Sequence, residues 1–151
     1  MATSREIVSE AFALKKPERV PLGICLGGSW PFFVEGVYLQ ELLSDTPSKA
    51  AEIFYRVNER VRADFVTVGT GATAFIIEAL GGKIKFTKNG APEIDSLLIS
   101  SLEDIDRLDL QTVFRSEKLK WLKAVAAETV KLNESKHNNN QRSLFVIPQS
   151  L

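Results

Sequence analysis

Two glycine-containing segments stand where a ligand could be held. Gly69, Gly71 and Ala74 form a G-x-G-x-x-A pattern, which follows an apolar, β-branched run and precedes a helix-like stretch. Such a loop binds the phosphates of a dinucleotide when it opens the first strand–helix–strand unit of a fold. Here it follows the second predicted strand, and an Asn89–Gly90 turn stands where a parallel strand ending in an acid should come. The pattern favours a tight strand-to-helix turn, with a small nucleotide-binding α/β protein as the alternative.

The second segment, residues 27–33, reads Gly-Gly-Ser-Trp-Pro-Phe-Phe and follows the apolar run 20–26. In an α/β barrel, the loops that follow the strands build the active site. Aromatic side chains in such a loop could line a pocket, although burial is their more frequent use. The candidates for substrate contact are Gly28 and Trp30 in this loop and Thr70 and Thr73 after the second strand.

The chain has one cysteine and one histidine, Cys25 and His137, which lie far apart in the sequence. They cannot supply the usual soft ligands of a zinc site. Cys25 lies in an apolar run, where burial raises the pKa of a thiol, so it is interpreted as an inert hydrophobic residue. His137 lies in an asparagine-rich segment and is interpreted as a surface residue. The sequence predicts no catalytic and no metal-binding residue.

Composition excludes several classes of partner. The chain of 151 residues carries 19 basic and 19 acidic residues and has no net charge, so no global field favours nucleic acid or a membrane surface. Lys118, Lys120 and Lys123 flank Trp121, but acidic neighbours make a solvated helix face the better interpretation. No apolar run approaches the roughly 20 residues of a membrane helix, and no secretory signal precedes the first helix. The expected location is the cytoplasm.

Capping signals and apolar periodicity predict helices at 3–14, 46–61, 72–80 and 116–132 and a helical turn from Ser101. Apolar runs predict buried strands at 20–26, 63–68 and 143–151, whereas alternation around Asn89–Gly90 predicts a hairpin of residues 83–87 and 92–98. The polar segment 133–142 is predicted to be a loop. Alternating strands and helices indicate the α/β class.

Several blocks of the sequence resemble the N-terminal part of the uroporphyrinogen decarboxylase family in order and spacing. The resemblance lies in residues 3–12, Lys16-Pro17-Glu18-Arg19-Val20-Pro21, Ala63-Asp64-Phe65-Val66, and residues 78–86, 89–94 and 105–108. It covers nearly the whole chain and implies one domain, residues 1–151, that forms the N-terminal portion of a (β/α)8 TIM barrel with an inserted β-hairpin. A complete barrel takes about 250 residues, so the fold is expected to be incomplete.

The decarboxylase branch of this family holds the many carboxylates of its substrate with arginines in the loop after the first strand. By resemblance, those arginines fall on Leu26 and Trp30, and residues 20–48 contain no lysine or arginine. The branch also places an aspartate after the second strand. The matching position is about Ala72, and residues 65–77 contain no acid. A carboxylate-rich tetrapyrrole would find no counter-charge here, so the resemblance disfavours porphyrinogen decarboxylation.

The methyltransferase branch is more compatible with these loops. The resemblance then implies an intact enzyme that uses zinc, a corrinoid protein partner and a small methyl donor or thiol acceptor. Its zinc ligands follow a His-x-Cys and later Cys pattern in the second half of the barrel, and Cys25 matches none of them. This chain is therefore expected to bind no cofactor and to be a catalytically silent fragment. The alternatives are a carboxy-lyase and a non-catalytic fragment stable only by association with itself or with a missing C-terminal half.

Overall fold

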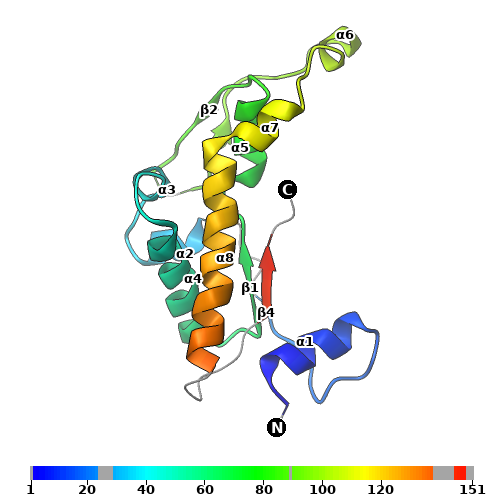
Figure 1. Ribbon diagram of the computed structural model, residues 1–151, viewed down its shortest axis with the longest axis vertical. Helices are drawn as coiled ribbons and strands as arrows, with labels where there is room; N and C mark the ends of the chain where they lie inside the picture. The colour runs from blue at the N-terminus through cyan, green and yellow to red at the C-terminus, as the bar shows by residue number, and fades with distance from the viewer. Residues whose placement is uncertain (1, 24–28, 89, 138–144, 149–151) are drawn as a thin grey trace.

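The computed structural model describes residues 2–23, 29–88, 90–137 and 145–148. Its two longest helices, α4 (Pro47–Val61) and α8 (Glu117–His137), pack against each other and against strand β1 (Phe65–Val68) (Figure 1). A second strand, β4 (Phe145–Pro148), lies beside β1. The other elements are α1 (Ser4–Phe12), α2 (Trp30–Val34), α3 (Leu39–Leu42), α5 (Ala72–Ala79), β2 (Ile84–Lys85), β3 (Glu93–Ile94), α6 (Leu102–Ile105) and α7 (Gln111–Arg115).

The parallel strands give the fold its α/β character. β1 and β4 pair in parallel, with Phe65 opposite Phe145, and Gly23 forms a parallel bridge with Phe65 as well. A Cβ atom on Gly23 would come within 1.6 Å of the Phe65 ring, so the ring lies directly over this glycine. One long helix separates Gly23 from β1, and another separates β1 from β4, which is the expected α/β order. Of the predicted strand 20–26, residues 24–26 lie outside the described residues.

The predicted helix 46–61 is confirmed as α4. Thr46 is extended, Pro47 occupies the first turn, and the left-handed conformation of Arg62 (φ 54°) ends the helix. One face is apolar and fully buried because its residues recur at helical spacing. This face builds the core with Val66 and Val68 of β1 and with Leu119, Leu122 and Val125 of α8.

Helix α8 is longer than the sequence indicates. Residues 133–142 are predicted to be a loop, yet the helix continues to His137 and Asn133 is buried inside it. No glycine or proline interrupts this stretch, so the packed helix continues through residues of modest helix propensity. Within the described residues, no helix is long and apolar enough to cross a membrane.

The shorter elements follow their local signals. Thr3 and Glu6 form the predicted capping box of α1, and Ile7 and Val8 bury one side of that helix. Strands β2 and β3 pair in the antiparallel sense over two residues each, fewer than predicted, and Asn89 of the predicted turn lies outside the described residues. The short helices α2, α3 and α7 carry too few periodic residues to be predicted from sequence.

Candidate functional site

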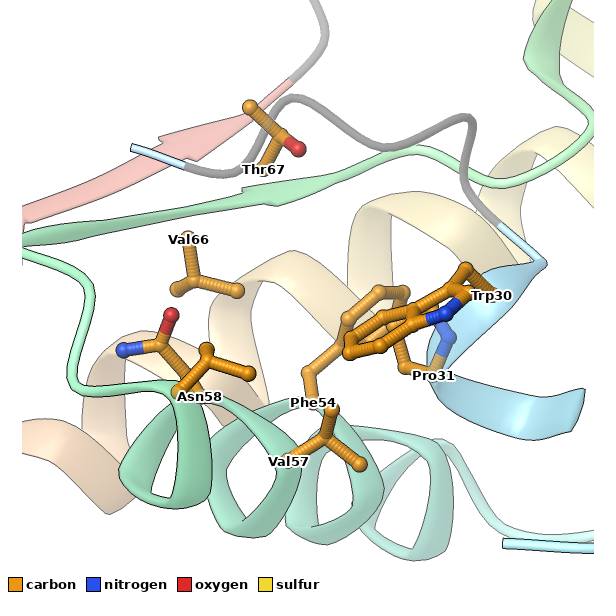
Figure 2. Close-up of a pocket in the computed structure, with 8 residues that line it drawn as sticks. Trp30, Pro31, Phe54, Val57, Asn58, Val66 and Thr67 are labelled. Carbon is orange, nitrogen blue, oxygen red and sulfur yellow. The ribbon is translucent and has the colours of Figure 1, made fainter. Parts of the chain in front are cut away.

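A small cavity lies between α2, α4 and β1. Trp30 and Pro31 of α2 and Val66 and Thr67 of β1 line it together with α4 (Figure 2). Its volume is about 30 Å³, enough for a water molecule. Sites for small organic ligands span about 300–1,000 Å³. In this form the cavity cannot enclose an organic substrate.

Helix α4 supplies the remaining wall of the cavity. Phe54, Val57 and Asn58 share one helix face because they are three and four residues apart. The Asn58 side-chain amide donates a 3.2 Å hydrogen bond to the carbonyl of Ala63, which closes the turn from α4 to β1. Phe32 packs edge-on against Phe54, with ring centroids 5.0 Å apart. The cavity is therefore held by side chains that already serve the core.

The four candidates for substrate contact do not gather at one place. Trp30 lines the cavity and is half-buried, and Thr70 is fully buried in the turn between β1 and α5. Thr73 is exposed in the first turn of α5, and Gly28 lies outside the described residues. Neither Thr70 nor Thr73 lines a described cavity. Substrate contact by these four residues stays a prediction.

The glycine pattern after β1 has a backbone role. Gly71 takes the left-handed conformation, with φ 80°, and caps the start of α5. A Cβ atom there would lie 3.1 Å from the ring of Phe75 and 3.3 Å from the ring of Pro92. This geometry is the tight strand-to-helix turn that the sequence favours, and it accounts for Gly71 without a bound phosphate.

Replacing Gly71 by alanine is expected to lower the free energy of unfolding by about 2 kcal/mol. The left-handed conformation costs an alanine about 1–2 kcal/mol, and crowding against Phe75 adds to it. Gly36→Ala is the matched control, since Gly36 has φ 68° with open space around it. Urea unfolding should show a larger loss for Gly71→Ala than for Gly36→Ala, and equal losses would contradict the crowding.

Among the described residues, Lys88 brings a cation to the segment 29–38 from a distant part of the chain. The ammonium group of Lys88 lies 5.9 Å from the centre of the Tyr38 ring, and both residues line a second cavity with Ser29. The sequence interpretation considered only residues 20–48 and so missed Lys88. The local pattern predicts the hairpin that carries Lys88, but it does not indicate that the hairpin lies beside Tyr38.

Zinc does not fit the part of the chain that the structure describes. Among these residues, no three histidine, cysteine, aspartate or glutamate side chains come together as a metal site. Cys25 lies outside the described residues, and His137 is the last residue of α8. We therefore derive no chemical step through zinc for this chain.

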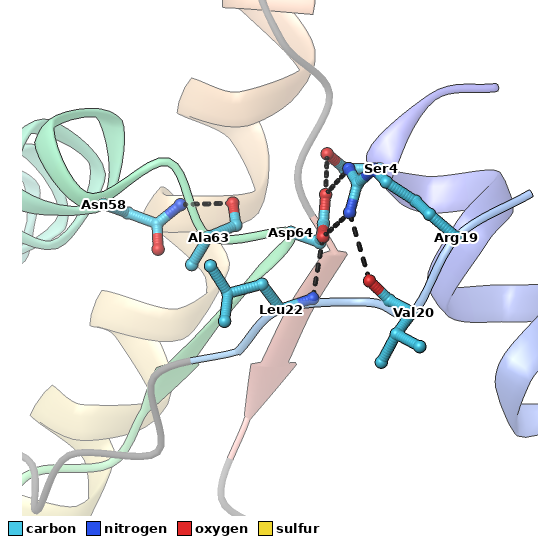
Figure 3. Close-up of polar contacts among 7 residues, drawn as sticks. All are labelled: Ser4, Arg19, Val20, Leu22, Asn58, Ala63 and Asp64. Carbon is cyan, nitrogen blue, oxygen red and sulfur yellow. Dashed lines mark hydrogen bonds and ion pairs between the residues drawn. The ribbon is translucent and has the colours of Figure 1, made fainter. Parts of the chain in front are cut away.

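The strongest electrostatic feature lies at the other end of β1, around Asp64 (Figure 3). Both guanidinium nitrogens of Arg19 donate to its carboxylate at 2.6 Å, the Ser4 hydroxyl donates at 2.6 Å and the Leu22 amide at 2.8 Å. The Arg19 hydrogen bonds hold the pKa of Asp64 well below its usual value, although burial opposes them. The cluster ties α1 and the segment before Gly23 to β1, so its role is structural.

The lysine and tryptophan side chains at the start of α8 form ion pairs and hydrogen bonds within the chain. Lys118 pairs with Glu78 and Lys120 with Glu117, and the Trp121 indole donates to a backbone carbonyl. These contacts give Lys118, Lys120 and Trp121 partners within the chain, and the absence of a nucleic-acid partner stays a prediction.

Comparison with known proteins gives a match to a protein family. A family model described as "Uroporphyrinogen decarboxylase (URO-D)" matches residues 3–138. No curated protein and no solved structure matches the chain.

Proposed function

Because the chain belongs to the uroporphyrinogen decarboxylase family, we propose that it contributes to an enzyme of that family whose substrate is not a carboxylate-rich tetrapyrrole. The family fold is a TIM barrel, and the described α/β elements are consistent with part of one. The corrinoid-linked methyltransferase branch fits best, with a corrinoid protein and a small methyl donor or thiol acceptor as partners.

The observation that carries this proposal is that the loop after the first predicted strand has no basic residue of its own, and that Lys88 brings only one ammonium group to the segment beside it. Residues 20–48 contain no lysine or arginine, and residues 65–77 contain no acid. Several substrate carboxylates would require several basic donors, since a charge that leaves water must be paired. The loop residues Trp30 and Phe32 instead pack against α4, which leaves an apolar wall.

In that branch, a zinc-bound thiol acts as the methyl acceptor because the metal lowers the pKa of the thiol. The described residues hold no zinc site, so their proposed contribution is to shape the wall around a small substrate. Trp30 of α2 and Val66 of β1 line the cavity between these elements and would form part of that wall. Turnover by this chain alone is not expected.

The test uses the natural protein, purified from the organism that encodes the chain. We expect methyl transfer from methylcobalamin to a thiol, loss of that activity on chelation and recovery with zinc. We expect no conversion of uroporphyrinogen to coproporphyrinogen. Decarboxylation, or methyl transfer that survives removal of zinc, would contradict the proposal.

A second candidate is a non-catalytic chain that is stabilised by association. Exposed apolar side chains on the segment from β3 to α7 favour it, since such surface is usually covered. The most exposed are Leu97, Leu102, Leu110 and Phe114. Light scattering after size-exclusion chromatography should then show a dimer or larger assembly, and a monodisperse monomer that unfolds cooperatively would count against it.

A further inference from the structure

A notch beside α2 combines a buried hydroxyl with an exposed ammonium group. Ser29, Tyr38, Lys88 and Gly90 contribute to its lining, together with apolar residues of α2 and α3. Its volume is about 10 Å³, which is close to the smallest space that accepts one oxygen atom or water molecule. A larger ligand could insert one oxygen and leave its remaining atoms outside.

The hydroxyl of Ser29 lacks a partner within the described residues. Ser29 is only 8% exposed, and its Oγ atom is buried without a hydrogen bond. Buried polar side chains are normally satisfied, because an unpaired one loses its hydration without compensation. A serine hydroxyl can donate to an acceptor that enters the notch. The unpaired group therefore points to an oxygen-bearing ligand.

Lys88 supplies the positive charge. Its ammonium group lies over the Tyr38 ring and, in the described part of the chain, forms no ion pair, whereas nearby Lys85 pairs with Glu93 at 3.2 Å. A lysine ammonium acts as a compact point charge that suits carboxylate and phosphate oxygens. Among the described residues, the notch is thus lined by a serine whose buried hydroxyl is unpaired and by a lysine that forms no ion pair.

We propose that this notch binds one oxyanion group, a carboxylate or a phosphate, of a small molecule. One oxygen accepts from Ser29 Oγ while the rest of the group faces Lys88. A single cation suits a ligand with one anionic group and not a polycarboxylate. The identification of this ligand as the substrate rests on the proposed function, but its binding does not.

Binding is tested by NMR titration of the full chain with acetate and, separately, with inorganic phosphate at constant ionic strength. We expect saturable shifts of the backbone amides of residues 29, 30, 32–39 and 88, and the anion that binds more tightly identifies the chemistry. Lys88→Met and Ser29→Ala should each weaken binding about tenfold. Lys85→Met, which removes a paired lysine from the same segment, should leave the affinity unchanged.

Ser29→Ala also separates a ligand-binding role from a structural one. Loss of an unpaired buried hydroxyl should leave the melting temperature unchanged or raise it, while anion binding weakens. Absence of saturable shifts, or equal weakening by Lys85→Met and Lys88→Met, would overturn the proposal. Anion binding without methyl transfer would refute only the proposed function. Methyl transfer without anion binding would refute only this site.

Discussion

Asp64→Asn is expected to lower the free energy of unfolding by about 3 kcal/mol at neutral pH. Its side chain is fully buried and accepts hydrogen bonds from the Ser4 hydroxyl, the Leu22 amide and both guanidinium nitrogens of Arg19. Loss of one partner of a buried ion pair costs about 3–5 kcal/mol, because the other charge is left without compensation. The Arg19 side chain is 46% exposed, so water can solvate its charge when Asp64 is replaced. The expected loss of stability therefore lies at the low end of this range.

The effect of Asp64→Asn should depend on pH. An aspartate in an unfolded chain has a pKa of about 3.9, whereas Arg19 holds the pKa of Asp64 in the folded chain well below its usual value. A lowered folded-state pKa gives stability that is present above the unfolded pKa and is lost as pH falls towards the folded one. The difference between wild type and Asp64→Asn should be full above about pH 5 and shrink steadily below about pH 4.

Urea unfolding from pH 7 to pH 2 measures both effects. Asp45→Asn is the matched control, since Asp45 pairs with Lys49 on the surface and both side chains are substantially exposed. An exposed pair contributes at most about 1 kcal/mol, so this variant should change stability little. A loss for Asp64→Asn that equals the control, or that does not change with pH, would show that the buried cluster does not stabilise β1.

Local signals predicted the elements that form the core. The Thr3 and Glu6 capping box, the Thr46–Pro47 start of α4 and the apolar period of α8 all have short-range causes, and the structure contains each of them. The end of α8 was predicted wrongly, because asparagine-rich composition indicates a loop but packing buries Asn133 within the helix. Propensity is a weak signal against tertiary contacts.

Long-range contacts could not be predicted from the sequence. Arg19 and Asp64 are 45 residues apart, and no period or motif pairs them. Lys88 reaches Tyr38 through the β2–β3 connection, so the absence of lysine and arginine from residues 20–48 gave no indication of this cation. Finding the candidate site therefore requires the three-dimensional structure, whereas the family resemblance could be found from the order of short sequence blocks.

Phe75→Ala is expected to lower the free energy of unfolding by about 4 kcal/mol, more than Asp64→Asn. Phe75 is fully buried, and its ring lies beside Phe86 with 6.3 Å between centroids. Lys118, which is held by Glu78, lies 5.6 Å from the same ring. Truncation of a buried phenylalanine to alanine costs about 3–5 kcal/mol through lost burial and the cavity left behind.

Phe114→Ala is the control for this change, because Phe114 is 75% exposed and its loss should cost less than about 0.5 kcal/mol. Equal effects of the two variants in urea unfolding would mean that the ring of Phe75 is not part of the core.

The double variant Gly71→Ala with Phe75→Ala tests how the turn and the core depend on each other. An alanine at Gly71 crowds the Phe75 ring, and removal of the ring abolishes that contact while the strain of the positive φ remains. The combined loss of stability should therefore be smaller than the sum of the two single losses by about 0.5–1 kcal/mol, as for residues in contact. Strict additivity would mean that backbone conformation alone requires glycine at this turn. A shortfall would mean that Phe75 also requires it, which would couple the loop after β1 to the packing of α5 and β2.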